Sequence, residues 1–214
     1  MDPKHLRIYL VTDEGLSGAR GVVETVRQAV AGGVTIVQLR DHDASSRRLV
    51  ETARQLLEVT RSAGVPFVVD DRLDVALAVG ADGVHLGQSD LDPVDARRIA
   101  GPGFLIGHSV SSPDELRAAD EWPAGTVDYL GIGPLRATTT KPNAAAPLGY
   151  DGVRAIAGAT ALPSVAIGGI GVGDVAPLLD AGVDGVAVVS AICAAADPAA
   201  AAAELRTAVE RSAP

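Results

Sequence analysis

Short apolar runs rich in β-branched residues alternate along this chain with longer segments in which apolar residues recur every three or four positions. The short runs are typical of buried strands, and the longer segments are typical of amphipathic helices. Strands are predicted at Arg7–Thr12, Thr35–Leu39, Pro66–Val69, Gly83–Leu86, Phe104–Ile106, Tyr129–Ile132, Ser164–Ile167 and Gly185–Val188. Helices are predicted near Val22–Ala31, Ser46–Ala63, Leu73–Val79, Pro93–Ile99, Pro113–Ala119, Tyr150–Ile156, Val172–Asp180 and Pro198–Arg211.

Eight strand–helix units in succession predict one (β/α)₈ TIM barrel over residues 1–214, with no linker that would divide the chain. Helix starts support this division of the chain. Asp92, Ser112 and Asp197 each precede a proline, which places a capping side chain before a residue suited to the first helical turn. About 27 residues per unit leave little room for insertions, so the barrel should be small for its fold.

Composition and charge narrow the classes of function. The net charge of −9 argues against nucleic acid as a partner, because phosphate backbones are bound by surplus Lys and Arg. Cys193 is the one cysteine, so a disulfide framework is excluded and the thiol is expected in the core. The chain shows neither a leader-like apolar segment nor the ~18 continuous apolar residues of a membrane span. A cytoplasmic protein without a membrane partner is therefore expected.

The segment Gly131–Lys141 follows a predicted strand and combines glycines, three threonines and one lysine. These residues suit a phosphorylated ligand, because backbone amides, hydroxyls and a cation all bind phosphate oxygens. Ala166–Ile170 and Ala187–Ala191 also end apolar runs. Three loops could therefore meet on one phosphate, since anion sites commonly follow the last strands of such barrels.

Charged residues gather where the second, third and fourth strands should end. Gln38 and Arg40 share one face of the second strand, and Arg40 either binds phosphate or pairs with an acidic neighbour at the rim. Asp71 and Asp90 follow the next two strands and could hold Mg²⁺ through hard oxygen ligands. The structural alternatives are that Asp71 caps the helix that follows and that Asp90 is an ordinary loop residue.

Two histidines and a serine lie near the fourth and fifth strand ends. Ser109 is expected to be a hydrogen-bond partner, because no adjacent base pattern marks it as a nucleophile. Alternation predicts that His108 points away from Ser109. His85 lies between Val84 and Leu86 and is expected to be a satisfied core residue and not a catalyst.

Taken in order and spacing, these motifs resemble the thiamine-phosphate synthase family over almost the whole chain. That resemblance implies an enzyme that condenses a hydroxymethylpyrimidine diphosphate with a hydroxyethylthiazole phosphate and uses Mg²⁺ as cofactor. The matching segments are Tyr9–Asp13, Val37–Arg40, Asp71, Ala81–Gln88 with Asp90, Ser109, Gly133-Pro134, Thr138–Lys141, Ala166–Ile170 and Val188–Ile192.

By position, the resemblance implies three groups of site residues. The pyrimidine diphosphate would be bound by Gln38, Leu39, Arg40, Asp41, His42, Asp70, Ser109 and Lys141, of which Arg40, Ser109 and Lys141 would act in catalysis. The thiazole phosphate would be bound by Thr138, Thr139, Thr140, Gly169, Val189 and Ser190, and Mg²⁺ by Asp71 and Asp90. The partners are thus small phosphorylated substrates, and a homo-oligomer is compatible with the sequence.

The chain departs from the family pattern at three places. His42 stands where a lysine is common, Asp70 where an asparagine is frequent, and Val110-Ser111 where a Thr-His pair is common. Two alternatives stay open at this point. A thiazole tautomerase on the same barrel would explain the phosphate loops but not Arg40, Lys141 and the carboxylates together. A non-catalytic binder of thiamine precursors would retain the pockets without the reaction.

Overall fold

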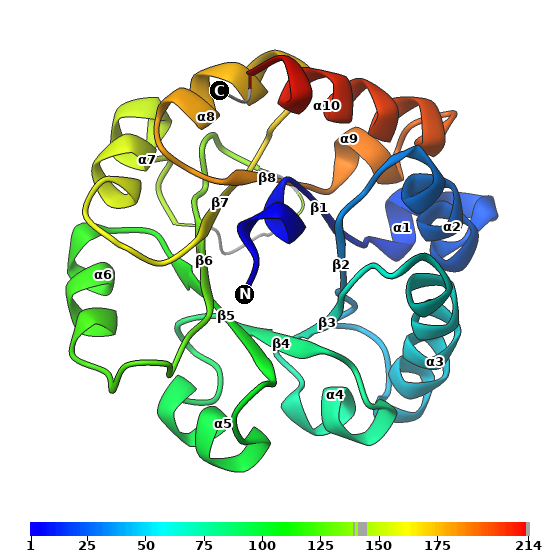
Figure 1. The fold of residues 1–214 in the computed structure, drawn as a ribbon. Helices are drawn as coiled ribbons and strands as arrows, with labels where there is room; N and C mark the ends of the chain where they lie inside the picture. Colours follow the sequence, from blue (N-terminus) through cyan, green and yellow to red (C-terminus); the bar gives the residue numbers. More distant parts are fainter. Residues whose placement is uncertain (139, 141–144, 213–214) are drawn as a thin grey trace.

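Parallel strands form the centre of the molecule. The computed structural model describes residues 1–138, 140 and 145–212, and in these residues eight strands pair in chain order and close into a barrel. The strands are β1 (Ile8–Val11), β2 (Ile36–Leu39), β3 (Phe67–Asp70), β4 (Gly83–Leu86), β5 (Leu105–Val110), β6 (Tyr129–Ile132), β7 (Ser164–Ile167) and β8 (Gly185–Val188). β8 pairs with β1, which closes the ring seen in Figure 1. The predicted TIM barrel is confirmed.

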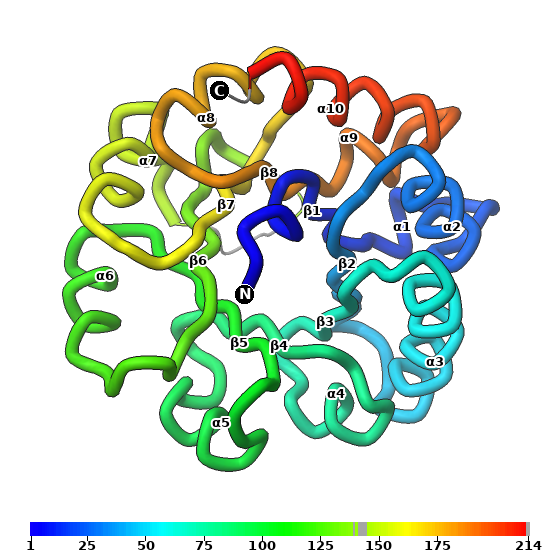
Figure 2. The backbone as a smooth tube through the Cα atoms, in the orientation of Figure 1, coloured from blue at the N-terminus to red at the C-terminus, as the bar shows by residue number. Residues whose placement is uncertain are grey.

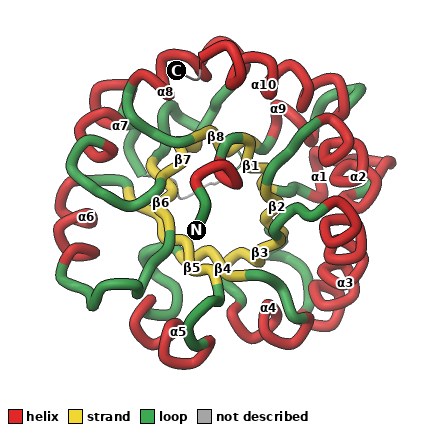
Figure 3. The backbone as a smooth tube through the Cα atoms, in the orientation of Figure 1, coloured by secondary structure: helices red, strands yellow, loops and turns green. Residues whose placement is uncertain are grey.

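Helices surround the strands on the outside (Figure 3). They are α1 (Glu14–Ser17), α2 (Val22–Gly32), α3 (Ser46–Ala63), α4 (Leu73–Val79), α5 (Pro93–Ala100), α6 (Pro113–Asp120), α7 (Gly149–Ala157), α8 (Val175–Asp180), α9 (Ser190–Cys193) and α10 (Pro198–Ser212). The 3₁₀ turns are η1 (Pro3–Leu6), η2 (Gly18–Arg20) and η3 (Val172–Asp174). The three predicted caps are present, because Asp92, Ser112 and Asp197 each accept a backbone N–H at a helix start.

Alternation along each strand divides the core into two layers. Outward-facing side chains such as Leu10, Val37 and Val69 pack against the helices in a large cluster. Inward-facing side chains form a smaller cluster inside the barrel, which includes Tyr9 and Tyr129. The interior is therefore filled by side chains, as expected of a barrel of eight strands.

The N-terminal segment covers one end of the barrel. η1 directly precedes β1, and Figure 2 shows the chain start lying over the barrel opening. Leu6 is fully buried in the inner cluster, and Met1 packs against this cluster. Because η1 covers the end where strands begin, ligands have access to the opposite end, where β1–β8 finish. In the part of the chain that the structure describes, no helix is both long and apolar enough to cross a membrane.

The observed elements differ from the predicted ones in three respects. β5 continues to Val110, four residues beyond the predicted end, so His108 and Ser109 lie within the strand. The short helices α1 and α9 were not predicted, because four residues are too few to show a helical period. The region predicted as one helix at Val172–Asp180 is divided between η3 and α8.

Candidate active site

A polar cluster lies at the carboxyl ends of β2 and β3. The amide of Gln38 donates to Oδ1 of Asp70 at 2.8 Å, and Nε of Arg40 lies 3.6 Å from Oδ2 of the same carboxylate. Gln38 is 4% exposed, and the side chains of Arg40 and Asp70 are 15% and 13% exposed. The backbone N–H of Arg40 also donates to the hydroxyl of Thr12. Ion pairs are stronger in such partly desolvated surroundings, so the cluster holds its charged groups in fixed positions.

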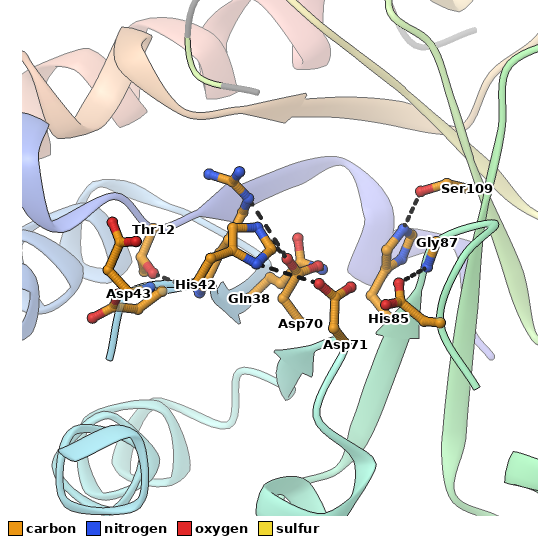
Figure 4. A network of polar contacts seen from close by, with 12 residues as sticks. Thr12, Gln38, His42, Asp43, Asp70, Asp71, His85, Gly87 and Ser109 are labelled. Carbon is orange, nitrogen blue, oxygen red and sulfur yellow. Dashed lines mark hydrogen bonds and ion pairs between the residues drawn. The ribbon is translucent and has the colours of Figure 1, made fainter. Parts of the chain in front are cut away.

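His42 contacts two carboxylates in this cluster, those of Asp70 and Asp71 (Figure 4). Its Nε2 is 3.6 Å from Oδ2 of Asp70, and its Nδ1 is 3.4 Å from Oδ2 of Asp71. One potential ligand atom from each of these three residues lies within 4.8 Å of the other two. Two of the departures from the family pattern, His42 and Asp70, are thus direct neighbours.

Asp71 adopts a left-handed backbone with φ of 59°, and among the described residues it is the one non-glycine with positive φ. Its N–H donates to the carbonyl of His85 at 2.8 Å, which ties it to the end of β4. Arg72, and not Asp71, occupies the N-cap of α4. The capping alternative is therefore wrong for Asp71. A strained backbone at a strand end is typical of functional sites.

Asp90 belongs to the loop that follows β4. Its Oδ2 accepts the N–H of Gly87 at 2.7 Å, which closes a tight turn around the carboxylate. Gln88 in the same turn donates to the carbonyl of Ser109 at 2.7 Å and to Nε2 of His108 at 2.9 Å. The loop with the predicted metal ligand Asp90 is therefore attached to β5.

Ser109 ends a chain of hydrogen bonds that crosses the barrel interior. Its hydroxyl lies 3.0 Å from Nε2 of His85, and Nδ1 of His85 lies 3.2 Å from the hydroxyl of Tyr129. That hydroxyl lies 2.8 Å from the hydroxyl of Tyr9. Gly107 makes this packing possible, since a Cβ there would lie 2.1 Å from Cζ of Tyr129. The four side chains orient one another, and of their polar groups the Ser109 hydroxyl lies nearest to the carboxyl ends of the strands.

Both tyrosines are neutral over the ordinary pH range. Burial raises the pKa of Tyr9 and the pKa of Tyr129 well above the usual value of 10.0. Neither tyrosine was predicted as a site residue, although Tyr9 begins a segment that matches the family, because both stand within apolar strands and resemble core positions. Strand alternation together with glycines at positions 107 and 131 could have revealed a large polar group inside the barrel. His85 is half-buried and both of its ring nitrogens have hydrogen-bond partners in this network, as predicted for a satisfied histidine.

Several predicted site residues point elsewhere or serve local structure. Leu39 is 2% exposed and packs among the outward-facing core residues, so its side chain points away from the barrel interior. The carboxylate of Asp41 accepts the N–H groups of Asp43 and Ala44, which shapes the turn after β2. His108 points away from Ser109 as predicted and meets Trp122 edge-on at 5.1 Å between ring centroids. Burial lowers the pKa of His108, so the imidazole is neutral.

The predicted phosphate loops follow β6, β7 and β8. The hydroxyls of Thr138 and Thr140 lie 2.8 Å apart, and Gly169 has a positive φ of 69° in the next loop. Val189 is the N-cap of α9, and Ser190 is its first residue. Thr139 and Lys141 lie outside the described residues, so their predicted roles stay predictions.

Burial raises the pKa of Cys193 to about 11, which keeps this thiol protonated and unreactive.

Comparison with known proteins identifies the family. The family model described as thiamine monophosphate synthase matches residues 8–192. Thiamine-phosphate synthases of Azorhizobium caulinodans and Xanthobacter autotrophicus are 51% and 53% identical to this chain, over 98% and 97% of both sequences. A solved structure named thiamine phosphate pyrophosphorylase from Pyrococcus furiosus superposes with a TM-score of 0.88, at 40% identity and 99% coverage of both chains. This chain therefore belongs to the thiamine monophosphate synthase family.

Proposed function

We propose that this protein joins 4-amino-2-methyl-5-hydroxymethylpyrimidine diphosphate to hydroxyethylthiazole phosphate, with Mg²⁺ as cofactor, and releases thiamine phosphate and pyrophosphate. The observation that carries the proposal is the polar cluster of Gln38, Arg40, Asp70 and Asp71, which lies at the open end of the barrel in a chain about half identical to thiamine-phosphate synthases along its length.

Arg40 and Lys141 would bind the diphosphate. The contact between Nε of Arg40 and Asp70 fixes the orientation of the planar guanidinium. The two Nη groups of an arginine lie in the same plane as Nε, beyond Cζ, and suit paired phosphate oxygens. Gln38 supports this arrangement, because its amide holds the other oxygen of Asp70. The proposed role of Lys141 rests on its place in the family motif.

Asp71 and Asp90 fit a magnesium ion as ligands. Both carboxylates offer hard oxygen atoms at the ends of adjacent strands, and magnesium sites commonly combine one or two carboxylates with substrate phosphates. The strained backbone of Asp71 supports this role, since strain of this kind persists where function requires it. When bound, Mg²⁺ would neutralise charge that develops on the departing pyrophosphate.

The chain's own residues would mainly assist departure of the leaving group and hold the reactants. As the bond between the pyrimidine methylene and the diphosphate oxygen breaks, Arg40 and Lys141 stabilise the growing negative charge. Ser109, held by His85 at 3.0 Å, would contact the pyrimidine and orient it. The thiazole nitrogen then forms the new bond to the methylene at close range. This route requires no general base.

The thiazole phosphate would bind at the loops after β6–β8. Hydroxyls of Thr138 and Thr140, with Thr139 beside them, would donate to phosphate oxygens, and backbone N–H groups near Gly169, Val189 and Ser190 would complete the site. The left-handed Gly169 supports this proposal, because a glycine lets the backbone approach an anion closely. Two anions would thus occupy separate parts of one barrel mouth.

The test combines purified protein with both substrates, in Mg²⁺ or in EDTA, and follows thiamine phosphate and pyrophosphate. Metal-dependent formation of both products in equal amounts is expected. Arg40→Gln should reduce turnover about 100-fold. Arg48→Gln is the matched control, because Arg48 pairs with Glu14 on the exposed surface, and its activity should be unchanged. Isomerisation of a thiazole carboxylate phosphate without condensation would instead identify a tautomerase.

A further inference from the structure

Two loops carry different parts of the proposed thiazole-phosphate site. The loop between β6 and α7 contains Thr138 and Thr140, and the loop between β7 and α8 contains Gly169. A phosphate held by both loops requires that their relative position be fixed before the ligand arrives. Otherwise binding must also supply the free energy that orders them.

Arg136 connects these loops directly. Its Nη1 donates to the carbonyl of Gly169 at 2.8 Å and to Oδ2 of Asp174 at 2.8 Å. Its Nη2 donates to Oδ1 of Asp174 at 2.5 Å and to the hydroxyl of Tyr150 at 3.0 Å. The hydroxyl of Tyr150 also donates to Asp174. We call these three side chains the Arg136–Asp174–Tyr150 clamp.

The clamp reaches the backbone on both sides. Asp174 accepts the N–H of Gly171 at 2.8 Å through Oδ2, so its carboxylate holds the loop after β7 from within. The N–H of Arg136 donates to the carbonyl of Gly168 at 3.1 Å. A Cβ on Gly168 would lie 2.6 Å from Cβ of Pro134, so this glycine allows the two loops to pack together.

The contact with Gly169 has a consequence for anion binding. In a trans peptide the carbonyl and the following N–H point in opposite directions. With the Gly169 carbonyl held by Arg136, the N–H of Ile170 must point away from the guanidinium. Arg136 thereby fixes the direction of a donor in the loop that is proposed to bind phosphate.

The clamp differs from an ordinary surface ion pair. Arg136 is bidentate to a carboxylate whose side chain is only 13% exposed, although the arginine side chain itself is 45% exposed. The hydrogen bond from Arg136 holds the pKa of Asp174 well below its usual range, so the carboxylate stays ionised. Bidentate geometry and a third partner are the conditions under which such pairs contribute measurably.

We propose that Arg136, with Asp174 and Tyr150, is a positioning residue that preorganises the thiazole-phosphate site by locking the loop after β6 to the loop after β7. The inference rests on the proposed function for the identity of the ligand. The clamp would act mainly on binding of the thiazole phosphate, because Arg40, Asp70 and Asp71 of the proposed diphosphate site lie at the ends of β2 and β3, and Lys141 alone among the proposed diphosphate ligands belongs to the loop after β6.

The test compares Arg136→Met, Arg136→Lys and Arg154→Met. Arg154 is the matched control, since it also joins α7 to α8, through a 2.7 Å bond from Nη1 to the carbonyl of Asp180, but at the other end of these helices. Arg136→Met should raise the KM and Kd for hydroxyethylthiazole phosphate about 10-fold, as expected for a coupling of about 1.4 kcal/mol. The KM for the pyrimidine diphosphate should change less than the KM for the thiazole phosphate, because most of the proposed diphosphate ligands lie outside the clamped loop. Arg136→Lys should recover part of the affinity.

Hydrogen exchange of the protein without ligand separates this inference from the proposed function. Exchange in the 166–174 segment should accelerate in Arg136→Met and stay unchanged in Arg154→Met. An Arg136→Met protein with wild-type Kd for the thiazole phosphate would overturn the inference. Equal weakening by Arg154→Met would also overturn it, because the effect would then reflect general packing of α7 on α8. Wild-type protein that binds the thiazole phosphate without condensing it would refute the proposed function while leaving the clamp supported.

Discussion

Replacement of Asp71 by Asn, Gly and Ala should separate the free-energy cost of its left-handed backbone from the contribution of its carboxylate to activity. The residue combines a left-handed φ of 59° with a carboxylate that faces Nδ1 of His42 at 3.4 Å. Asn keeps the size of the side chain and tolerates the left-handed backbone, Gly has no penalty there, and Ala has the full penalty. All three variants remove the carboxylate.

The stability differences follow from general backbone energies. A left-handed conformation costs an ordinary residue about 1–2 kcal/mol, and Asn lowers that cost through local hydrogen bonds. Gly avoids the strain but loses about 0.5–1 kcal/mol through the greater freedom of the unfolded chain. We therefore expect Asn and Gly to be similar in stability, and Ala to be about 1 kcal/mol less stable. For a chain of this length, that corresponds to a Tm lower by about 2–4 °C.

Activity should follow a different order. Because each variant removes a proposed ligand of Mg²⁺, all three should lose about 100-fold or more in kcat/KM, regardless of stability. Thermal unfolding followed by circular dichroism gives the first order, and release of pyrophosphate gives the second. Asp74→Asn is the control, since Asp74 lies three residues away and pairs with Arg72 at the surface, and both its Tm and its activity should be near wild type.

Two results would refute this reasoning. An Ala variant as stable as the Asn variant would show that the backbone at Asp71 is not strained. An Asn variant with wild-type turnover in Mg²⁺ would show that the carboxylate is not needed as a ligand, and the metal would have to be sought elsewhere.

Four further predictions concern other parts of the barrel. Tyr129→Phe should lower stability by about 1–3 kcal/mol, because it leaves buried partners unsatisfied, and a urea titration measures this. Because burial raises the pKa of both tyrosines, they ionise more easily in the unfolded chain than in the folded protein. The stability that this difference contributes is therefore fully present below pH 10.0 and is lost as the pH rises above it. Melting curves across that pH range test the sign. Arg97→Met should cost about 2 kcal/mol by breaking a 2.7 Å pair with Asp128, yet leave kcat unchanged. His42→Lys should tighten diphosphate binding above neutral pH, because lysine stays charged there, and calorimetry against inorganic pyrophosphate would reveal an unchanged affinity if this is wrong.

The fold was predictable because the local sequence signals in each strand–helix unit agree with the structure that the unit adopts. Apolar strands such as Tyr129–Ile132 match the observed element at both ends, and helix starts with Asp92 or Ser112 before proline occur where predicted. β5 was predicted too short, because Gly107 and the polar pair His108 and Ser109 interrupt its apolar pattern. The glycine at position 107 leaves room for the ring of Tyr129. This contact joins segments far apart in the sequence, so the local pattern of residues does not reveal it.

The sequence indicated which strand ends carry the candidate residues, but not how those residues pair. The sequence places Arg40 and Asp71 at strand ends, where parallel strands bring chemistry together. It does not specify that Gln38 and Arg40 both engage Asp70, since that depends on the stagger between β2 and β3. Arg136 was passed over for a similar reason, because its partner Asp174 lies 38 positions further along the chain.

Asp70 illustrates how a pairing changes the meaning of a residue. As an isolated carboxylate near the proposed diphosphate site, it would repel the ligand. In the structure its two oxygens face the amide of Gln38, Nε of Arg40 and Nε2 of His42. Its charge is thus met within the protein, and the contact of Nε of Arg40 with the same carboxylate restrains the guanidinium. His42 and Asp70, both expected from the sequence to depart from the family pattern, therefore belong to one set of contacts, in which the charge of Asp70 is met by Gln38, Arg40 and His42.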